Sequence, residues 1–265
     1  MPSSWFSTPA FIGVNHLPPL PGTPSSSLGL TAIVERALVD TTALVEGGAD
    51  GIIVENFGDA PFFKDVVPQH VVAAMTVIVS AVRSRAPGLL LGVNLLRNDA
   101  SAALAVAAAT GADFIRVNVH CGVAATDQGL IEGQAMQTLL LRRQLGANVA
   151  LFADVHVKHG RPLHPIDLTQ AALDTSQRGK ADVLILTGNA TGGAASVQEL
   201  LAVKKAGVRC PVLIGSGISP DNISSFVPGA DGVIVGTFLH RESQLSEPID
   251  AGRVVRMRQA LDACL

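Results

Sequence analysis

Short runs of apolar residues alternate with longer amphipathic stretches along almost the whole chain. The apolar runs have the length of buried strands, and the stretches between them have helical spacing. The predicted strands cover residues 11–17, 51–56, 89–96, 114–120, 149–158, 183–188, 212–217 and 232–237. The predicted helices cover residues 31–46, 71–85, 101–109, 131–145, 168–177, 197–206, 221–226 and 254–264.

One dipeptide recurs at the start of four predicted strands. Ala-Asp stands at 49–50, 112–113, 181–182 and 230–231, each time before a hydrophobic run, and a glycine directly precedes three of the four. A glycine in this place is typical of a helix end, followed by a short turn and a buried strand. Each interval between two copies has room for two strand–helix units of about 30 residues.

Eight alternating strands and helices predict a single α/β domain, a (β/α)8 barrel of parallel strands covered by helices. We expect one domain over residues 1–265, with residues 1–10 as an extension before the first strand. An open doubly wound sheet is the alternative, but it usually carries a Gly-rich dinucleotide turn after its first strand. Residues 13–19, Gly-Val-Asn-His-Leu-Pro-Pro, do not have that pattern.

Polar residues gather near the carboxyl ends of the predicted strands. Side chains alternate along a strand, so Arg116, Asn118 and His120 share one face, opposite an aliphatic set. The same alternation puts Asp154, His156 and Lys158 on one face, and we expect both polar sets to point into the barrel. Other strands add polar side chains near their carboxyl ends, namely Asn15, Glu55, Asn94 and Thr187.

Active sites of such barrels form at this end, so the polar set predicts an active site. We expect acid/base catalysis from Glu55, Asp154, His156 and Lys158. We expect substrate contacts from His16, Asn94, Arg116, Asn118, His120 and Thr187. A structural ion-pair network, such as Arg116 with Glu55 or Asp154, is the alternative. Lys158 could bind phosphate, act as a base, form an imine or pair with a carboxylate.

Small residues follow the last two predicted strands. In many barrels the backbone N–H groups of these two loops hold a phosphate. The predicted phosphate ligands are Gly215, Ser216, Gly217, Gly236 and Thr237. The alternative is that these glycines only turn the chain. Residues 187–193 could form a third wall or a lid, and the long loops at 56–62 and 121–129 could be lids or subunit contacts.

Composition excludes several classes of protein. Hydrophobic residues make up 48% of the 265 and charged residues only 15%, so the chain can build a large core. The low charge favours a homo-oligomer and is compatible with peripheral membrane association. A net charge of −3 without a basic run argues against nucleic-acid binding, and no stretch has the ~20 apolar residues of a membrane span. Three cysteines without CxxC spacing indicate reduced thiols and a cytoplasmic location.

Taken together, several segments resemble the BtpA family. They are GVNHLPPLPG (13–22), DGIIVENFGDAPF (50–62), GVNLLRND (92–99), RVNVH (116–120), TDQGLIEG (126–133), ADVHVKH (153–159), LIGSG (213–217) and DGVIVGT (231–237). The resemblance implies a TIM-barrel enzyme of the phosphate-binding kind, and an association with the biogenesis or stability of photosystem I. It brings no settled reaction, and members outside phototrophs imply a wider role.

The function expected first is that of an enzyme acting on a small phosphorylated metabolite, a sugar phosphate or a nucleotide. Isomerisation, lyase chemistry and glycosidic-bond cleavage all fit the predicted groups. One alternative is a metal-dependent hydrolase, with a divalent metal on Glu55, His120, Asp154 and His156. Another is a non-catalytic assembly factor. No organic cofactor is predicted.

Overall fold

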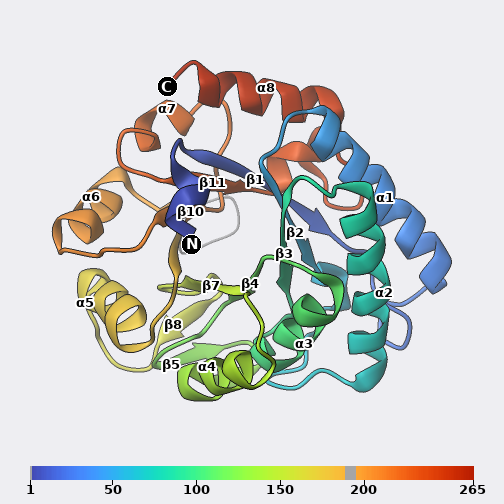
Figure 1. Ribbon diagram of the computed structural model, residues 1–265, viewed down its shortest axis with the longest axis horizontal. Coiled ribbons are helices and arrows are strands. Elements are labelled where there is room, and N and C mark those ends of the chain that lie inside the picture. The colour runs from blue at the N-terminus through green and yellow to red at the C-terminus, as the bar shows by residue number, and fades with distance from the viewer. Residues whose placement is uncertain (1, 189–194) are drawn as a thin grey trace.

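Eight parallel strands close into a barrel in the computed structural model, which describes residues 2–188 and 195–265 (Figure 1). Around the barrel the strands follow the order β1-β11-β10-β9-β7-β4-β3-β2. Their bounds are β1 Ala10–His16, β2 Gly51–Glu55, β3 Leu90–Asn94, β4 Phe114–Val117, β7 Ala150–Asp154, β9 Val183–Thr187, β10 Val212–Gly215 and β11 Gly232–Val235. The predicted (β/α)8 barrel is therefore confirmed, although several strands end earlier than predicted.

Helices form a ring outside the strands (Figure 1). Their bounds are α1 Leu30–Glu46, α2 Gln69–Arg85, α3 Ala100–Thr110, α4 Ala135–Gln144, α5 Leu168–Leu173, α6 Val197–Lys205, α7 Ile223–Phe226 and α8 Ala251–Asp262. A π-helical turn, η3 (Asp174–Arg178), continues α5. Short 3-10 helices are η1 Pro2–Phe6, η2 Phe57–Asp59, η4 Thr237–Leu239 and η5 Arg241–Ser243.

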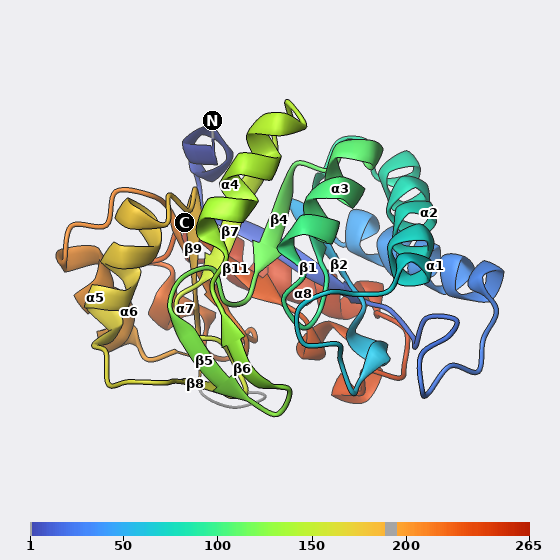
Figure 2. The ribbon, with the colours of Figure 1, turned by 90° about the horizontal axis from the view of Figure 1, so that it is seen from below.

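The predicted helix at 131–145 begins too early. Residues 129–132 instead form β6 (Gly129–Glu132), which pairs antiparallel with β5 (Val123–Thr126), and β5 also pairs with β8 (Gly160–Pro162). Gly129 has φ +96°, a conformation that allows the tight turn of this hairpin. Figure 2 shows this small sheet at one end of the barrel and η1 at the other. The loop predicted at 121–129 is thus largely a β-hairpin.

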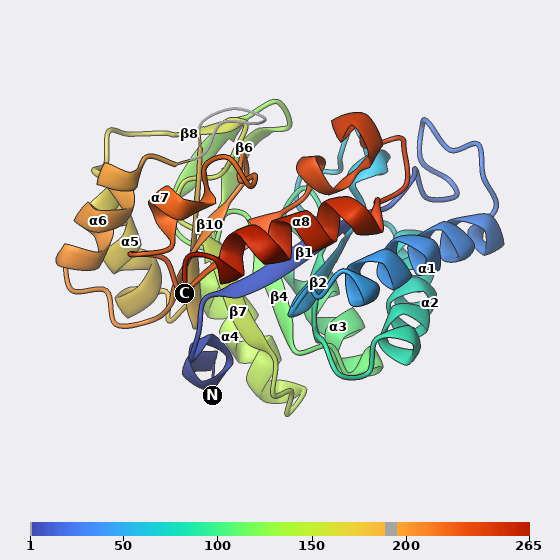
Figure 3. The ribbon, with the colours of Figure 1, turned by 90° about the horizontal axis from the view of Figure 1, so that it is seen from above.

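Two hydrophobic layers hold the barrel together. The inner layer fills the barrel, where the rings of Phe114 and Phe152 stack with centroids 4.0 Å apart. Trp5 and Phe6 of η1 lie 6.4 Å and 6.2 Å from Phe152, so the amino-terminal extension closes that end of the barrel. The outer layer lies between strands and helices, and α8 crosses over β1 in the view from above (Figure 3).

The aspartates of the Ala-Asp repeat have a common role at the amino-terminal end of the barrel. Each carboxylate accepts a backbone N–H from the preceding strand of the barrel, at 2.6 to 2.8 Å. Each also pairs with a basic side chain from an outer helix. The pairs are Asp50–Arg258, Asp113–Arg83, Asp182–Arg142 and Asp231–Lys204. The repeat therefore ties every second strand to its neighbour and to a helix.

No helix in the described ranges is long and apolar enough to cross a membrane.

Candidate functional site

A pocket of about 410 Å³ opens at the carboxyl ends of the barrel strands, and we call it the mouth pocket. This volume lies within the usual range for small-molecule sites. Nine of the predicted site residues line it: His16, Glu55, Arg116, Asn118, Lys158, Ser216, Gly217, Gly236 and Thr237. Phe57 and Phe62 from the loop at 56–62 and Asp127 from the loop at 121–129 also line it. Residues that the sequence did not single out complete the wall: Val14, Leu96, Arg97, His159, Ile218, Ser219, Ile234, Phe238 and Ser243.

The buried charges at the mouth form one network around Arg116. Its Nε and Nη2 donate to the two carboxylate oxygens of Asp154, both at 3.1 Å, and its Nη1 lies 3.9 Å from Oε2 of Glu55. Asn118 donates to Asp154 at 2.9 Å, and Asn94 donates to Glu55 at 2.6 Å. The alternative interpretation expected Arg116 to pair with Glu55 or Asp154; both contacts are present, at the place where a barrel active site would form.

Electrostatics keep Arg116 charged in this setting. Burial alone would lower its pKa, but Asp154 and Glu55 together hold the pKa above its usual value. Asp154 accepts three hydrogen bonds, two from Arg116 and one from Asn118, so both of its carboxylate oxygens are engaged. Its place in the site is to fix the guanidinium. Glu55 accepts a hydrogen bond from Asn94 but lies farther from the guanidinium than Asp154 does, at 3.9 Å against 3.1 Å. Glu55 lines the mouth pocket.

Lys158 and Arg97 bring further positive charge to the mouth pocket. Burial lowers the pKa of Lys158, while the nearby Glu55 raises it and Arg116 lowers it. Arg97 donates to the backbone oxygen of Lys158 at 2.5 Å and so holds the lysine loop in place. In the sequence, Arg97 begins a run of polar residues directly after the predicted strand at 89–96, and this position could have marked it as a site residue. Its contact with Lys158 could not be foreseen, because the two residues are 61 positions apart.

His16 is part of a pair of imidazoles. Nδ1 of His240 lies 2.6 Å from the backbone oxygen of Glu247, which can only accept, so this nitrogen carries a hydrogen. Burial lowers the pKa of both histidines, that of His16 to about 3, so both are neutral at pH 7. Nε2 of His240 is then an acceptor, and Nδ1 of His16 donates to it at 3.2 Å. Nε2 of His16 is then left as an acceptor, and His16 lines the mouth pocket.

The turns after β10 and β11 form the other side of the mouth pocket. Ser216 and Gly217 have φ of +74° and +67°, and a serine in this conformation is strained. Asn222 fixes the turn, since it donates to the backbone oxygen of Gly217 at 2.7 Å and accepts from the N–H of Ser219 at 3.0 Å. At Gly236 a Cβ would lie 2.5 Å from the ring of His16, so a larger residue does not fit there. Backbone turns of this kind can cradle an anion.

Several predicted residues lie elsewhere. His120 is buried behind the barrel wall, with Nε2 2.8 Å from the backbone oxygen of Gly179, and burial lowers its pKa. Thr187 donates to the backbone oxygen of His156 at 2.8 Å and does not line the mouth pocket. The expectation that Asn15 faces the barrel interior is wrong, because it donates outward to Ala37 on α1 at 2.8 Å.

Gly215 sits within β10, just before the turn that reaches the mouth pocket. Residues 189–193 of the predicted third wall lie outside the described residues.

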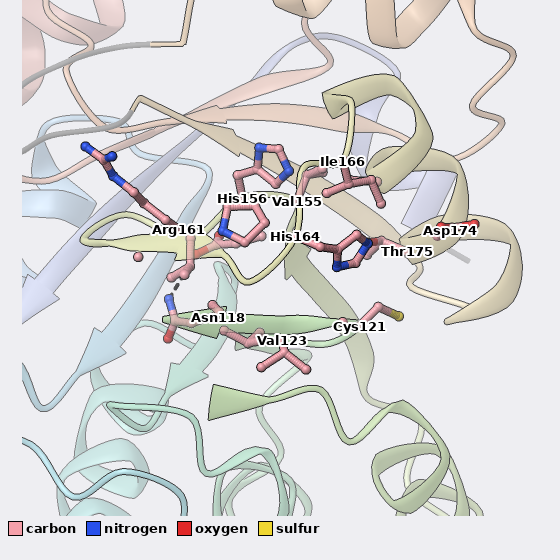
Figure 4. Close-up of a pocket in the computed structure, with 18 residues that line it drawn as sticks. Asn118, Cys121, Val123, Val155, His156, Arg161, His164, Ile166, Asp174 and Thr175 are labelled. Atoms are coloured by element: carbon pink, nitrogen blue, oxygen red, sulfur yellow. Dashed lines mark hydrogen bonds between the residues drawn. The ribbon is translucent and has the colours of Figure 1, made fainter. Parts of the chain in front are cut away.

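His156 lines a second, smaller pocket, which we call the side pocket. It lies between the small sheet and α5, beside Asn118 and Asp154, and Asn118 lines both pockets (Figure 4). Burial lowers the pKa of His156. Cys121 also lies here, and burial raises the pKa of its thiol.

The predicted metal ligands are not assembled. Within residues 2–188 and 195–265, no three His, Cys, Asp or Glu side chains are grouped closely enough to hold a metal ion. Glu55 and Asp154 flank the guanidinium of Arg116, and His120 and His156 lie outside the mouth pocket.

Comparison with known proteins places these residues in a family. The BtpA family model matches residues 7–263. The chain belongs to the BtpA family. It is 50% identical over 252 residues to the photosystem I biogenesis protein BtpA of Synechocystis sp., covering 94% of this chain and 87% of that protein. It is also 43% identical to an uncharacterized protein of Pyrococcus furiosus, over 97% of each chain.

Solved structures support the fold of this BtpA-family chain. One is (S)-3-O-geranylgeranylglyceryl phosphate synthase from Thermoplasma acidophilum, in complex with sn-glycerol-1-phosphate. It has a TM-score of 0.61 and 15% identity, covering 98% of this chain and 96% of that chain. Phosphoribosyl anthranilate isomerase from Thermus thermophilus has a TM-score of 0.56 and 12% identity, covering 97% and 100%. At these identities the likeness concerns the fold alone.

Proposed function

We propose that this protein is an enzyme that acts on a small phosphorylated metabolite, a sugar phosphate or a nucleotide, by acid/base chemistry in the mouth pocket. One observation carries the proposal. A single pocket joins the turns after β10 and β11 to Glu55, Arg116 and Lys158. One of the proteins with a similar fold was solved with sn-glycerol-1-phosphate, which is a ligand of the proposed class.

The phosphate would bind at the turns that carry Ser216, Gly217, Gly236 and Thr237. Their backbone N–H groups are suited to phosphate oxygens, and Gly217 and Gly236 allow close approach. Lys158 adds a positive charge to the same pocket. Arg116 and Asn118 would orient the rest of the substrate or stabilise negative charge that develops on it.

Proton transfer would involve Glu55 and Lys158. Lys158 has a pKa lowered by burial, which brings its amine closer to the neutral form that accepts a proton. His16 offers an unprotonated Nε2 to the same pocket. Asp154 acts as a positioning residue for Arg116. His156 can take part only if a portion of the substrate reaches the side pocket.

The proposal is tested by ligand binding to the intact protein and to a matched pair of glycine variants. A panel of phosphorylated metabolites and inorganic phosphate is screened by thermal unfolding. A ligand at about 100 times its Kd stabilises the folded state by about 2.7 kcal/mol, which should raise the Tm by about 5 °C or more. Gly217→Asp puts a carboxylate where the phosphate would bind. Gly207→Asp is the control, because Gly207 also has positive φ and lies in an exposed turn after α6.

The expected result is a Tm shift that Gly207→Asp retains and Gly217→Asp loses. If no phosphorylated compound shifts the Tm of well-folded protein, the proposal fails. It also fails if Gly217→Asp leaves the shift intact, because the phosphate would then bind elsewhere.

A second candidate function is that of a non-catalytic assembly factor. The 50% identity to the Synechocystis photosystem I biogenesis protein favours it. The two functions differ in what they require of the mouth pocket. An assembly factor keeps its cellular role when Lys158→Ala or Asp154→Asn is introduced, whereas an enzyme loses it. Complementation of a strain lacking the protein with these variants distinguishes them.

A further inference from the structure

The side pocket is walled by two structures of different kinds. The small antiparallel sheet lies on one side, and α5 with η3 on the other (Figure 4). Asp154, the last residue of β7, lines it at the barrel. Figure 4 shows Asn118 at one side of the pocket and Cys121 and Thr175 at the other. Its volume is about 170 Å³. An apolar cavity of about 150 Å³ holds one benzene molecule, so the side pocket has the size for a single ring.

The walls of the side pocket are mostly apolar. Val123 and Ala124 contribute from β5, Val155 and Val157 from the chain after β7, and Ala171 from α5. Side chains of this kind contact the faces of a flat ring and offer it no hydrogen bonds. Burial of apolar surface is therefore one source of affinity for a ligand here, at about 25 cal/mol per Å².

Two polar atoms among the lining residues lack a partner. Nε2 of His156 and Oδ1 of Asn118 are buried and accept or donate no hydrogen bond within the described part of the chain. A buried polar atom left in this state costs about 1–3 kcal/mol. A hydrocarbon ring would leave both unpaired, whereas a ring that carries nitrogen and N–H or C=O groups could bind them once the two side chains turn toward the pocket. The lining therefore favours a nitrogen heterocycle over a purely apolar ring.

The two pockets meet at Asn118. Asn118 lines both, and its Nδ2 donates to Asp154, whose carboxylate holds Arg116 at the mouth pocket. A ring in the side pocket would thus lie next to the charged network. A phosphate bound at Ser216 and Gly217 would lie across the mouth, at the ends of β10 and β11. One elongated molecule could occupy both places.

We propose that the side pocket binds the ring of the substrate, a single-ring nitrogen heterocycle carried by the same molecule whose phosphate occupies the mouth pocket. The linkage to phosphate rests on the proposed function, whereas ring binding in the side pocket can be tested without it. Of the two expected substrate classes, this favours a nucleotide-like compound over a simple sugar phosphate. His156 then contacts the ring and sets specificity for it.

The test uses four probes and isothermal calorimetry. Uracil tests the ring alone, inorganic phosphate tests the mouth pocket alone, and uridine 5′-monophosphate tests both together. Benzene is the hydrocarbon ring without polar groups. Val123→Phe fills the side pocket, and Val255→Phe on the outer face of α8 is the matched control, since Val255 is 37% exposed and far from both pockets.

We expect uracil to bind more tightly than benzene, and Val123→Phe to weaken uracil at least tenfold without changing the affinity for inorganic phosphate. Uridine 5′-monophosphate should bind at least 100-fold more tightly than either fragment, because linked fragments gain from effective concentration. Its affinity should fall at least tenfold in Val123→Phe and also in Gly217→Asp. Should Val123→Phe fail to fold, His156→Phe must weaken uracil relative to benzene.

Other results would overturn the proposal. Equal binding of uracil and benzene would show that the pocket is only apolar, and no binding of either would show that it holds water alone. An unchanged affinity for uracil in Val123→Phe would mean that the ring binds elsewhere. Equal affinities for uridine 5′-monophosphate and inorganic phosphate would mean the same. If uracil binds as expected but neither phosphate nor the nucleotide binds through Gly217, ring binding in the side pocket stands and the proposed function fails.

Discussion

The two ends of the barrel use charged side chains differently. At the amino-terminal end, four aspartates repeat on every second strand, and each meets one basic side chain and one backbone N–H. Their side chains are 28% to 45% exposed. At the carboxyl end, Glu55 and Asp154 share the guanidinium of Arg116, and none of the three side chains is more than 11% exposed.

The charged side chains at the two ends have different explanations. The repeated pairs satisfy backbone groups at strand starts, so the fold itself explains them. Stability does not explain the network at the mouth, because apolar residues of similar volume often do as well as a buried ion pair or better. Buried charges at the carboxyl ends of the strands, where barrel active sites form, are the groups that the proposed function uses.

The largest effect is expected from breaking the network at the mouth. Asp154→Ala leaves Arg116 buried with only Glu55 near it, and removal of one partner of a buried pair costs about 3–5 kcal/mol. Urea unfolding measures the free energy of unfolding. Asp262→Ala is the control, because this aspartate pairs with Arg258 on the surface and is 58% exposed. A loss below about 1 kcal/mol for Asp154→Ala would show that the two ends do not differ.

We expect the stability of the protein to depend on pH through a residue at the mouth pocket, and not through the aspartates at the amino-terminal end. His16 has a pKa of about 3 in the folded protein against 6.5 in the unfolded chain. Below pH 6.5 the unfolded chain therefore binds a proton that the folded protein does not, and stability falls as the pH drops from 6.5 toward 3. At 1.36 kcal/mol per pH unit, the loss between pH 6.5 and pH 5 is about 2 kcal/mol.

His16→Gln tests this, because an amide can still donate to His240 but does not titrate. The free energy of unfolding is measured at pH 7 and pH 5 for both proteins. We expect the difference between the two pH values to shrink by about 2 kcal/mol in the variant. An unchanged difference would mean that His16 takes up its proton over the same pH range in the folded protein as in the unfolded chain.

A smaller loss is expected at the amino-terminal end. Asp113→Ala removes the acceptor of the Leu91 N–H, which should cost about 1–2 kcal/mol because water can reach this partly exposed site. Asp113→Asn keeps an acceptor and should cost less. In a double variant with Asp113→Ala and Asp231→Ala, the two losses of unfolding free energy should add within about 0.5 kcal/mol. The two aspartates share no partner and start strands on different sides of the barrel. Strong non-additivity in urea unfolding would contradict the independence of the four pairs.

The sequence predicted the barrel because its signals are local and repeated. Strand length, helical spacing and the Ala-Asp repeat each follow from a few neighbouring residues. Alternation along a strand also placed Arg116 and Asp154 correctly. At Asn15 the same alternation points outward, because Asn15 shares the face of Phe11 and Gly13 within β1, and its amide donates to Ala37 on α1.

Alternation fails where a strand ends. β4 ends at Val117 and β7 at Asp154, so the directions of His120 and His156 follow loop geometry. The contact between His16 and His240 spans 224 positions and depends on the closure of the barrel. No local pattern reports such a contact, which is why the sequence alone could not show the pairing of the two imidazoles.

The smallest effect is expected when a basic partner at the amino-terminal end is replaced. Lys204→Met removes the charge that pairs with Asp231, but the carboxylate keeps its hydrogen bond to the Val212 N–H. Both side chains are 30% exposed, so the pair should contribute about 0.5 kcal/mol at low salt. In 1 M NaCl this contribution should vanish, because the screening length falls to about 3 Å. Urea unfolding of variant and wild type at both salt concentrations measures it. A loss above about 1.5 kcal/mol that persists in 1 M NaCl would mean that these pairs behave like the buried network, and the two ends would then differ in pattern but not in energetics.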